Sequence, residues 1–101
     1  MQRISNLAFN REFPDASGLS GIPASNRVRM ARDAANRFDP DAVGVWLEGY
    51  PHVPLGWLYR KDSNRGAVLR KLDSGGEVAG RIDQIARKKG GKPQKVVVFW
   101  L

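Results

Sequence analysis

Short stretches of alternating apolar and polar residues, divided by glycine, proline and asparagine, restrict the fold of this chain more than any other feature. In residues 27–32, Val28 and Met30 alternate with Arg27 and Arg29, which is the pattern of a strand with one buried face. Comparable stretches predict strands over residues 3–9, 42–47, 55–59, 77–85 and 96–101. The last stretch is almost wholly apolar, so we expect that strand to lie centrally or to be covered on both faces.

One helix is expected between the strands over 55–59 and 77–85. Apolar residues recur at helical spacing through residues 67–72, and Gly75-Gly76 supplies a stop signal. The side chains of residues 62–64 (Asp-Ser-Asn) are suited to capping its N-terminus. A chain of 101 residues has room for one core. We therefore predict a single domain over residues 1–101 that is mostly β with one main helix (α+β), built as a small β-barrel or strongly curved sheet.

Composition excludes several kinds of chemistry. The chain has no cysteine and one histidine, His52, which rules out disulfides, thiolate metal sites and sites built from several imidazoles. Asp39, Asp41 and Glu48 are conceivable as a metal-dependent nuclease site, but no lysine or histidine accompanies them in that segment. We predict a protein that is not an enzyme and uses no cofactor, metal or small-molecule substrate. No signal peptide or membrane span is evident, so we expect a cytoplasmic protein.

Positive charge is concentrated in the second half of the chain. Residues 1–51 carry six basic and six acidic residues, whereas residues 52–101 carry eleven basic and four acidic residues and hold the whole net charge of +7. Clustered lysine and arginine with a pI near 10.4 are typical of nucleic-acid binders. Solubility is the alternative explanation for the same excess.

The centre of the chain resembles a known family. Residues 32–43 contain an arginine, an acidic residue, an asparagine (Asn36), the aromatic–aspartate pair Phe38-Asp39, and then alanine with a β-branched residue. This order resembles the signature of the HIRAN domain. Residues 56–60 (Gly-Trp-Leu-Tyr-Arg) look like the following strand of that family, and residues 69–75 look like its helix that ends at glycine. The resemblance covers residues 27–101 well and residues 1–26, an N-terminal strand plus a long loop, in outline.

The resemblance implies an OB-like or SH3-like barrel and a function. HIRAN domains of fork-remodelling helicases capture the 3′ end of single-stranded DNA, and small stand-alone members of the family occur in bacteria and phages. By this resemblance Asp39 accepts a hydrogen bond from the terminal 3′-hydroxyl, Phe38 stacks on a base, and Arg60 with Lys61 holds phosphates. Many family members have tyrosine at the position of Phe38. An ionised carboxylate is a strong acceptor with no competing donor, so Asp39 suits a hydroxyl and repels a phosphate.

Further candidate nucleic-acid contacts complete the predicted site. Trp57 lies in the strand that leads to Arg60, Asn36 is expected to support the loop, and Phe9 or Phe13 is a candidate for the N-terminal aromatic of the family's pocket. The closing loop carries charge where the family has an aromatic, namely Arg87, Lys88 and Lys89. These contacts predict an electrostatic, salt-sensitive interaction with single-stranded nucleic acid, with DNA favoured over RNA.

Each candidate also has a structural interpretation. In that interpretation the side chain of Asp39, which precedes Pro40, caps a turn, and Phe38 is a core residue. Most of the aromatics in apolar strands are expected to be packing residues, namely Trp46, Trp57, Phe99 and Trp100. The alternative function is a protein-interaction module of a phage or mobile element, in which the long loop over residues 10–26 orders on a host partner.

Overall fold

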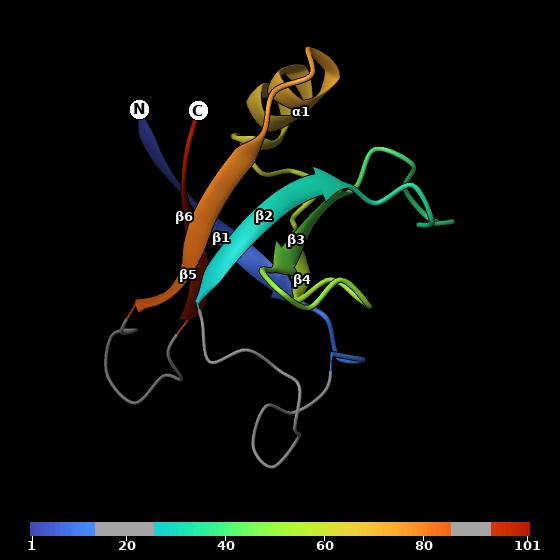
Figure 1. The fold of residues 1–101 in the computed structure, drawn as a ribbon, viewed down its shortest axis with the longest axis vertical. Helices are drawn as coiled ribbons and strands as arrows, with labels where there is room; N and C mark the ends of the chain where they lie inside the picture. Colours follow the sequence, from blue (N-terminus) through green and yellow to red (C-terminus); the bar gives the residue numbers. More distant parts are fainter. Residues whose placement is uncertain (14–25, 86–93) are drawn as a thin grey trace.

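The computed structural model describes residues 1–13, 26–85 and 94–101 and folds them into six strands and one helix (Figure 1). The strands are β1 (Gln2–Phe9), β2 (Arg27–Arg32), β3 (Val43–Leu47), β4 (Gly56–Leu58), β5 (Val78–Ile85) and β6 (Gln94–Trp100). Helix α1 (Arg65–Asp73) lies between β4 and β5. The strands pair antiparallel and close into a barrel in the order β1-β4-β3-β2-β5-β6. The predicted class, mostly β with one helix, is therefore confirmed.

The barrel is filled by the apolar side chains that occupy every second position of its strands. Because successive side chains of a strand point to opposite faces, Val28 and Met30 are buried while Arg27 and Arg29 are exposed, as predicted. In β6 the inward residues Val97 and Phe99 belong to the core. The intervening residues of β6, Val96 and Val98, are buried as well, so this strand is covered on both faces as expected. The core is completed by residues from the other strands, from α1 and from two loops: Leu7, Phe13, Val43, Val45, Leu47, Leu55, Leu58, Val68 and Val78.

Helix α1 lies at one end of the barrel, at the top of Figure 1, and contributes the fully buried Val68 to the core. The predicted glycine stop is confirmed. Gly75 has a φ of 84°, and its N–H donates to Leu72 O, while the N–H of Gly76 donates to Lys71 O. This paired arrangement is the Schellman ending, which favours glycine because the left-handed conformation is strained for other residues.

The start of α1 differs from the sequence-based expectation. Asn64 is the N-cap residue, but its side chain makes no capping hydrogen bond. Its amide nitrogen instead donates to Ile4 O and Ser5 Oγ, and the Ser5 hydroxyl donates to Asp62 Oδ1. The polar side chains at 62 and 64 therefore bind β1, because the closed barrel brings that strand beside the helix start.

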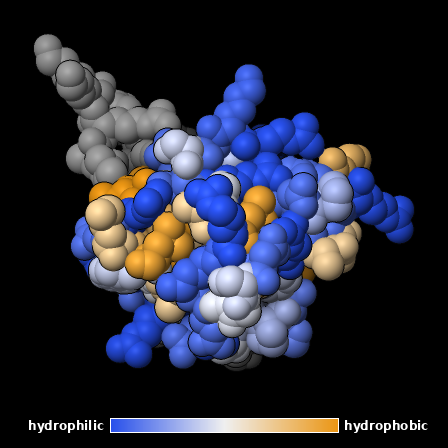
Figure 2. Space-filling model, turned by 90° about the horizontal axis from the view of Figure 1, so that it is seen from above, coloured by the Kyte–Doolittle hydropathy of each residue, from blue (hydrophilic) through white to orange (hydrophobic). Residues whose placement is uncertain are grey.

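The surface around α1 is largely hydrophilic, with small apolar areas, as the view from the helix end shows (Figure 2). The described part of the chain contains no helix that is long and apolar enough to cross a membrane.

Candidate functional site

An open groove of about 830 Å³ lies outside the barrel wall formed by β3 and β4. It is lined by residues of β3 and β4, of the segment over residues 33–42, and of segments 10–12 and 52–54. Half of its sixteen lining residues are apolar or aromatic and half are polar or charged. The lining residues are Asn10, Arg11, Glu12, Asp33, Ala35, Asn36, Arg37, Phe38, Asp39, Ala42, Trp46, His52, Val53, Pro54, Trp57 and Leu58.

Two half-buried tryptophans, Trp46 and Trp57, lie on the outer face of this wall. Trp57 is paired with Gly44 of β3 and with Ala8 of β1, so its neighbours across the sheet have little or no side chain. A Cβ at Gly44 would lie 2.8 Å from Trp46 Nε1, which shows that the Trp46 indole lies directly over this glycine. The Trp57 Nε1–H donates to Asp33 Oδ2 at 2.9 Å, which fixes the orientation of that indole. Small residues thus make room for an indole surface along the groove.

A tight loop shapes the margin of the groove beside these indoles. The side-chain oxygen of Asn36 accepts hydrogen bonds from the backbone N–H groups of Phe38 and Asp39 at 2.9 and 3.1 Å. The loop is closed by Asp39 O, which accepts from Ala42 N at 3.0 Å. Asn36 is therefore a turn former, as predicted. The same turn leaves the Phe38 side chain 92% exposed, so the interpretation of Phe38 as a core residue is wrong.

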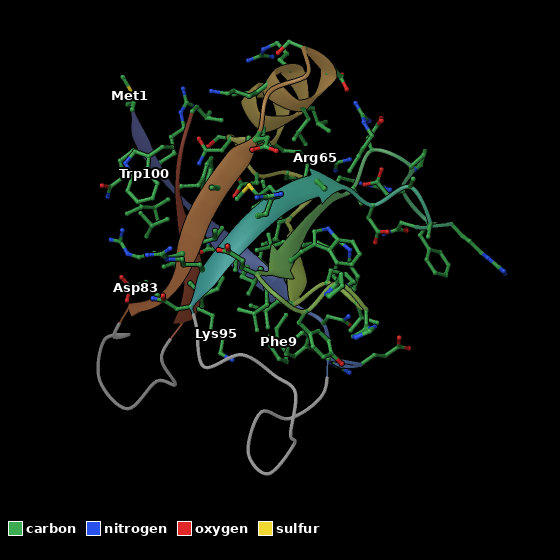
Figure 3. The ribbon with its side chains drawn as sticks, in the orientation of Figure 1. Met1, Phe9, Arg65, Asp83, Lys95 and Trp100 are labelled. Atoms are coloured by element: carbon green, nitrogen blue, oxygen red, sulfur yellow. The ribbon has the colours of Figure 1, made fainter. Side chains whose placement is uncertain are left out.

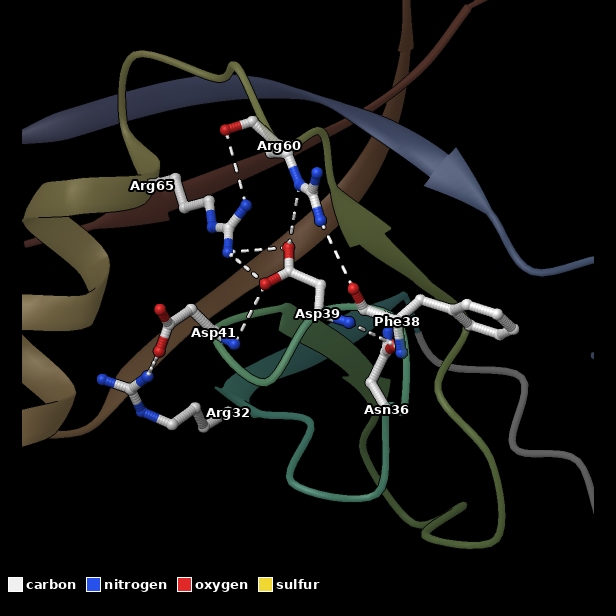
Figure 4. Close-up of polar contacts among 7 residues, drawn as sticks. All are labelled: Arg32, Asn36, Phe38, Asp39, Asp41, Arg60 and Arg65. Atoms are coloured by element: carbon white, nitrogen blue, oxygen red, sulfur yellow. Dashed lines mark hydrogen bonds and ion pairs between the residues drawn. The ribbon is translucent and has the colours of Figure 1, made fainter.

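The Asp39 carboxylate is held on both oxygens (Figure 4). Its Oδ1 accepts from the Asp41 backbone N–H at 3.1 Å and from Arg65 Nη2 at 3.0 Å. Its Oδ2 lies 2.8 Å from Arg65 Nη2 and 3.4 Å from Arg60 Nε. Arg60 also donates through Nη2 to Phe38 O at 3.4 Å. Asp39 caps its turn, as the structural interpretation expected, and it also gathers two arginines.

The surroundings of Asp39 keep it ionised. Partial burial raises the pKa of the Asp39 carboxyl, but the Asp41 N–H bond and the charges and hydrogen bonds of Arg65 and Arg60 outweigh it. The net effect holds this pKa below its ordinary value of 3.8. The groove therefore has an ionised carboxylate, paired with two arginines, on the residue that follows the exposed Phe38.

Besides Arg65, Arg32 also links this loop to helix α1. Arg32, at the end of β2, pairs with Asp41 in the loop and, at 2.8 Å, with Asp73 at the end of α1. Arg65, near the start of α1, holds Asp39. The loop is thus attached to both ends of α1.

The predicted contacts fall into three groups. Asn36, Phe38, Asp39 and Trp57 line the groove, and Arg60 joins them through its bonds to Phe38 and Asp39. Lys61 is exposed on the segment that follows β4. Arg87, Lys88 and Lys89 lie outside the described residues.

The N-terminal aromatics lie elsewhere. Phe9 packs edge-on against Phe13 and beneath the Lys95 ammonium, at the end of the barrel away from α1 (Figure 3). Phe13 is buried in the core. Neither residue is among those that line the groove.

Sequence reasoning missed Trp46, Arg37, Arg11 and His52, all of which line the groove. The expectation that the strand aromatics are mostly packing residues holds for Phe99, but Trp100 is 44% exposed and Trp46 lies outside the core. The signal for Trp46 was present, because alternation with Val45 and Leu47 places it on the opposite face of β3.

Comparison with protein-family models, with curated proteins and with solved structures finds no match to this chain. Among the side chains that the structure describes, no group of three or more histidines and carboxylates is arranged to hold a metal ion. The arrangement at the groove is suited to binding, because it combines an indole surface, the exposed Phe38 ring and an ionised carboxylate that is paired with the exposed Arg60.

Proposed function

We propose that this protein is a HIRAN-like module that binds single-stranded nucleic acid, DNA in preference to RNA, and favours a free 3′-hydroxyl end. One observation carries the proposal: the exposed Phe38 ring and the ionised Asp39 carboxylate belong to adjacent residues that both line a groove shared with two indoles. The sequence resemblance over residues 27–101 supports the same assignment. The proposal includes that the protein is not an enzyme and that it is cytoplasmic.

Stacking supports a single strand as the ligand. Unpaired bases expose their ring faces, and each base stacked on an aromatic side chain contributes about 1–3 kcal/mol. Trp46, Trp57 and Phe38 supply aromatic surface to the same groove. A duplex hides its base faces, so this surface favours a single strand.

Charge supports a nucleic acid and an end preference together. Arg11 and Arg37 line the groove and Arg60 stands at its margin, where they are available to phosphates. Asp39 opposes this pattern, because a carboxylate repels a phosphate. Besides its role in the turn, a carboxylate among these cations offers an acceptor to a ligand group that donates a hydrogen bond, and the terminal 3′-hydroxyl is such a donor.

Fluorescence anisotropy with a short labelled DNA strand tests the proposal. Unlabelled competitors end in a 3′-hydroxyl or a 3′-phosphate, and a matched pair carries the same change at the 5′ end. We expect the 3′-phosphate to weaken competition by about tenfold or more, because a hydrogen bond to a charged group is replaced by repulsion. The 5′ pair is expected to differ little. Equal competition by all four strands would contradict the end preference, and no binding at low salt would contradict nucleic-acid binding altogether.

The protein-interaction alternative depended on the loop over residues 10–26. Most of that loop, residues 14–25, lies outside the described residues. The alternative is distinguished in the same assay, because a strand held by phosphates is released by salt along a steep log–log slope.

A further inference from the structure

Each oxygen of the Asp39 carboxylate has two donor nitrogens within 3.4 Å in this structure. A carboxylate offers about two hydrogen-bonding sites on each oxygen. Oδ1 accepts from Asp41 N–H and from Arg65 Nη2. Oδ2 accepts from Arg60 Nε and forms an ion pair with Arg65 Nη2, 2.8 Å away. A hydroxyl that binds Asp39 at Oδ2 therefore competes with the donors already placed there.

The donors are not equally displaceable. Arg65 is held close, at 2.8 and 3.0 Å, and its side chain is only 11% exposed. The Asp41 N–H belongs to the turn that positions Asp39 itself. Arg60 makes a long contact of 3.4 Å and its side chain is 71% exposed, and exposed ion pairs of this kind contribute little. Arg60 is therefore the donor that gives way.

Arg60 also has a reason to move when a nucleotide arrives. A guanidinium binds phosphate through two parallel hydrogen bonds, which is stronger than its single long contact with Asp39. The exposed arginine lies beside the Phe38 backbone, at the same margin of the groove as the carboxylate. A phosphodiester that draws Arg60 away opens one site on Oδ2.

From these contacts, and resting on the proposed function, we infer that Arg60 makes hydroxyl recognition conditional on a neighbouring phosphate. Arg60 occupies Oδ2 until an anionic linkage binds it, and only then does Asp39 accept the terminal hydroxyl. The ligand class is therefore a 3′-terminal nucleotide with a charged phosphodiester on its 5′ side. A hydroxyl compound without that charge leaves Arg60 in place.

Four DNA strands test this coupling by fluorescence anisotropy. They end in a 3′-hydroxyl or a 3′-deoxy sugar, and the last linkage is either a native phosphodiester or an uncharged methylphosphonate. The measured quantity is the ratio of dissociation constants, deoxy over hydroxyl, for each linkage. For the wild type we expect a ratio of about tenfold with the phosphodiester and a ratio near one with the methylphosphonate.

Arg60→Met supplies the decisive comparison, because it opens Oδ2 permanently. In this variant we expect the hydroxyl preference to be equal for both linkages, although overall affinity falls. Lys61→Met is the matched control: it removes the adjacent charge, lowers overall affinity and keeps the dependence on the linkage. Circular dichroism checks that each variant is folded.

Two results overturn the inference and are distinguishable. A wild-type hydroxyl preference that is as large with the methylphosphonate as with the phosphodiester means that Arg60 does not control Asp39. No hydroxyl preference with the native strand overturns the proposed end recognition itself, and the coupling with it.

Discussion

Arg65, near the start of α1, lies 2.8 Å from Oδ2 of Asp39, twenty-six residues earlier in the chain. Both side chains are largely shielded from solvent, at 11% and 19% exposure. This pair fixes the carboxylate beside the groove, because the helix to which Arg65 belongs is itself anchored in the core through Val68. The position of the Asp39 carboxylate is thus set by the packing of the helix on the barrel as well as by its own loop.

The first prediction concerns pH. The folded-state pKa of Asp39 is lowered, so its ionised form stabilises the fold above the ordinary pKa of an aspartate, and this contribution is lost as pH falls through the lowered value. Asp39→Asn removes the charge that Arg65 and Arg60 bind. We expect the variant to be less stable than the wild type near neutral pH, with the difference shrinking in acid.

Urea denaturation at a series of pH values from about 6 to about 2.5 measures this difference across the titration range of aspartate. Subtracting the variant curve from the wild-type curve removes the contributions of other carboxylates. A difference that does not change with pH would show that the Asp39 charge is not what stabilises the loop.

The second prediction concerns Phe38. Its ring is 92% exposed, so Phe38→Ala is expected to leave the stability of the protein unchanged. If the ring stacks on a base, the same change weakens binding of a single strand between about fivefold and a hundredfold. Anisotropy measures the affinity and thermal unfolding measures the stability.

Trp100→Ala is the matched control for Phe38. Trp100 is an exposed aromatic on β6, which lies across the barrel from β3 in the strand order. We expect little change in affinity on its removal. Equal losses in the two variants would place the strand elsewhere than in the groove.

The third prediction concerns salt. Each phosphate neutralised by a cation changes the slope of log K against log salt by about 0.7 for a single strand. Arg60→Met is therefore expected to reduce the slope by about that amount, and Arg70→Met, on the exposed side of α1, to leave it unchanged. Identical slopes for wild type and Arg60→Met would mean that Arg60 contacts no phosphate.

The fourth prediction concerns the glycine beneath Trp46. Gly44→Ala places a Cβ 2.8 Å from Trp46 Nε1, and a packed indole has few ways to yield. We expect a loss of about 1–3 kcal/mol in the free energy of unfolding and a shift in tryptophan fluorescence as the ring is displaced. An unchanged spectrum and stability would contradict the packing described for the groove.

At another glycine, the substitution Gly66→Ala is expected to raise the free energy of unfolding. Gly66 is exposed in the first turn of α1, and its added Cβ would meet only the end of the flexible Arg70 side chain, at 3.4 Å. Alanine lowers the entropy of the unfolded chain and favours helix, so we expect a gain of about 0.4–1 kcal/mol in the free energy of unfolding. Urea denaturation of both glycine variants separates steric conflict from a general effect of substitution.

Much of the fold was predictable because it depends on local patterns. Alternation fixes which face of β2 is buried, and Gly75 follows the helix because its left-handed conformation favours glycine. The N-cap residue, Asn64, falls within the predicted 62–64 segment, but its side chain makes no capping bond because it binds the distant strand β1 instead. Local sequence holds no information about such a competitor.

The candidate site likewise has features that local sequence predicts and features that depend on the tertiary structure. The sequence by itself determined the strands, the helix and the Phe38-Asp39 turn, since Asn36 shapes that turn through residues two and three positions away. Only the tertiary structure decided that Trp46 and Trp57 share a groove with this turn and that Arg65 and Arg60 meet at Asp39. The physical reason is barrel closure: strand register brings together residues that are far apart in the chain, and neither periodicity nor composition specifies that register.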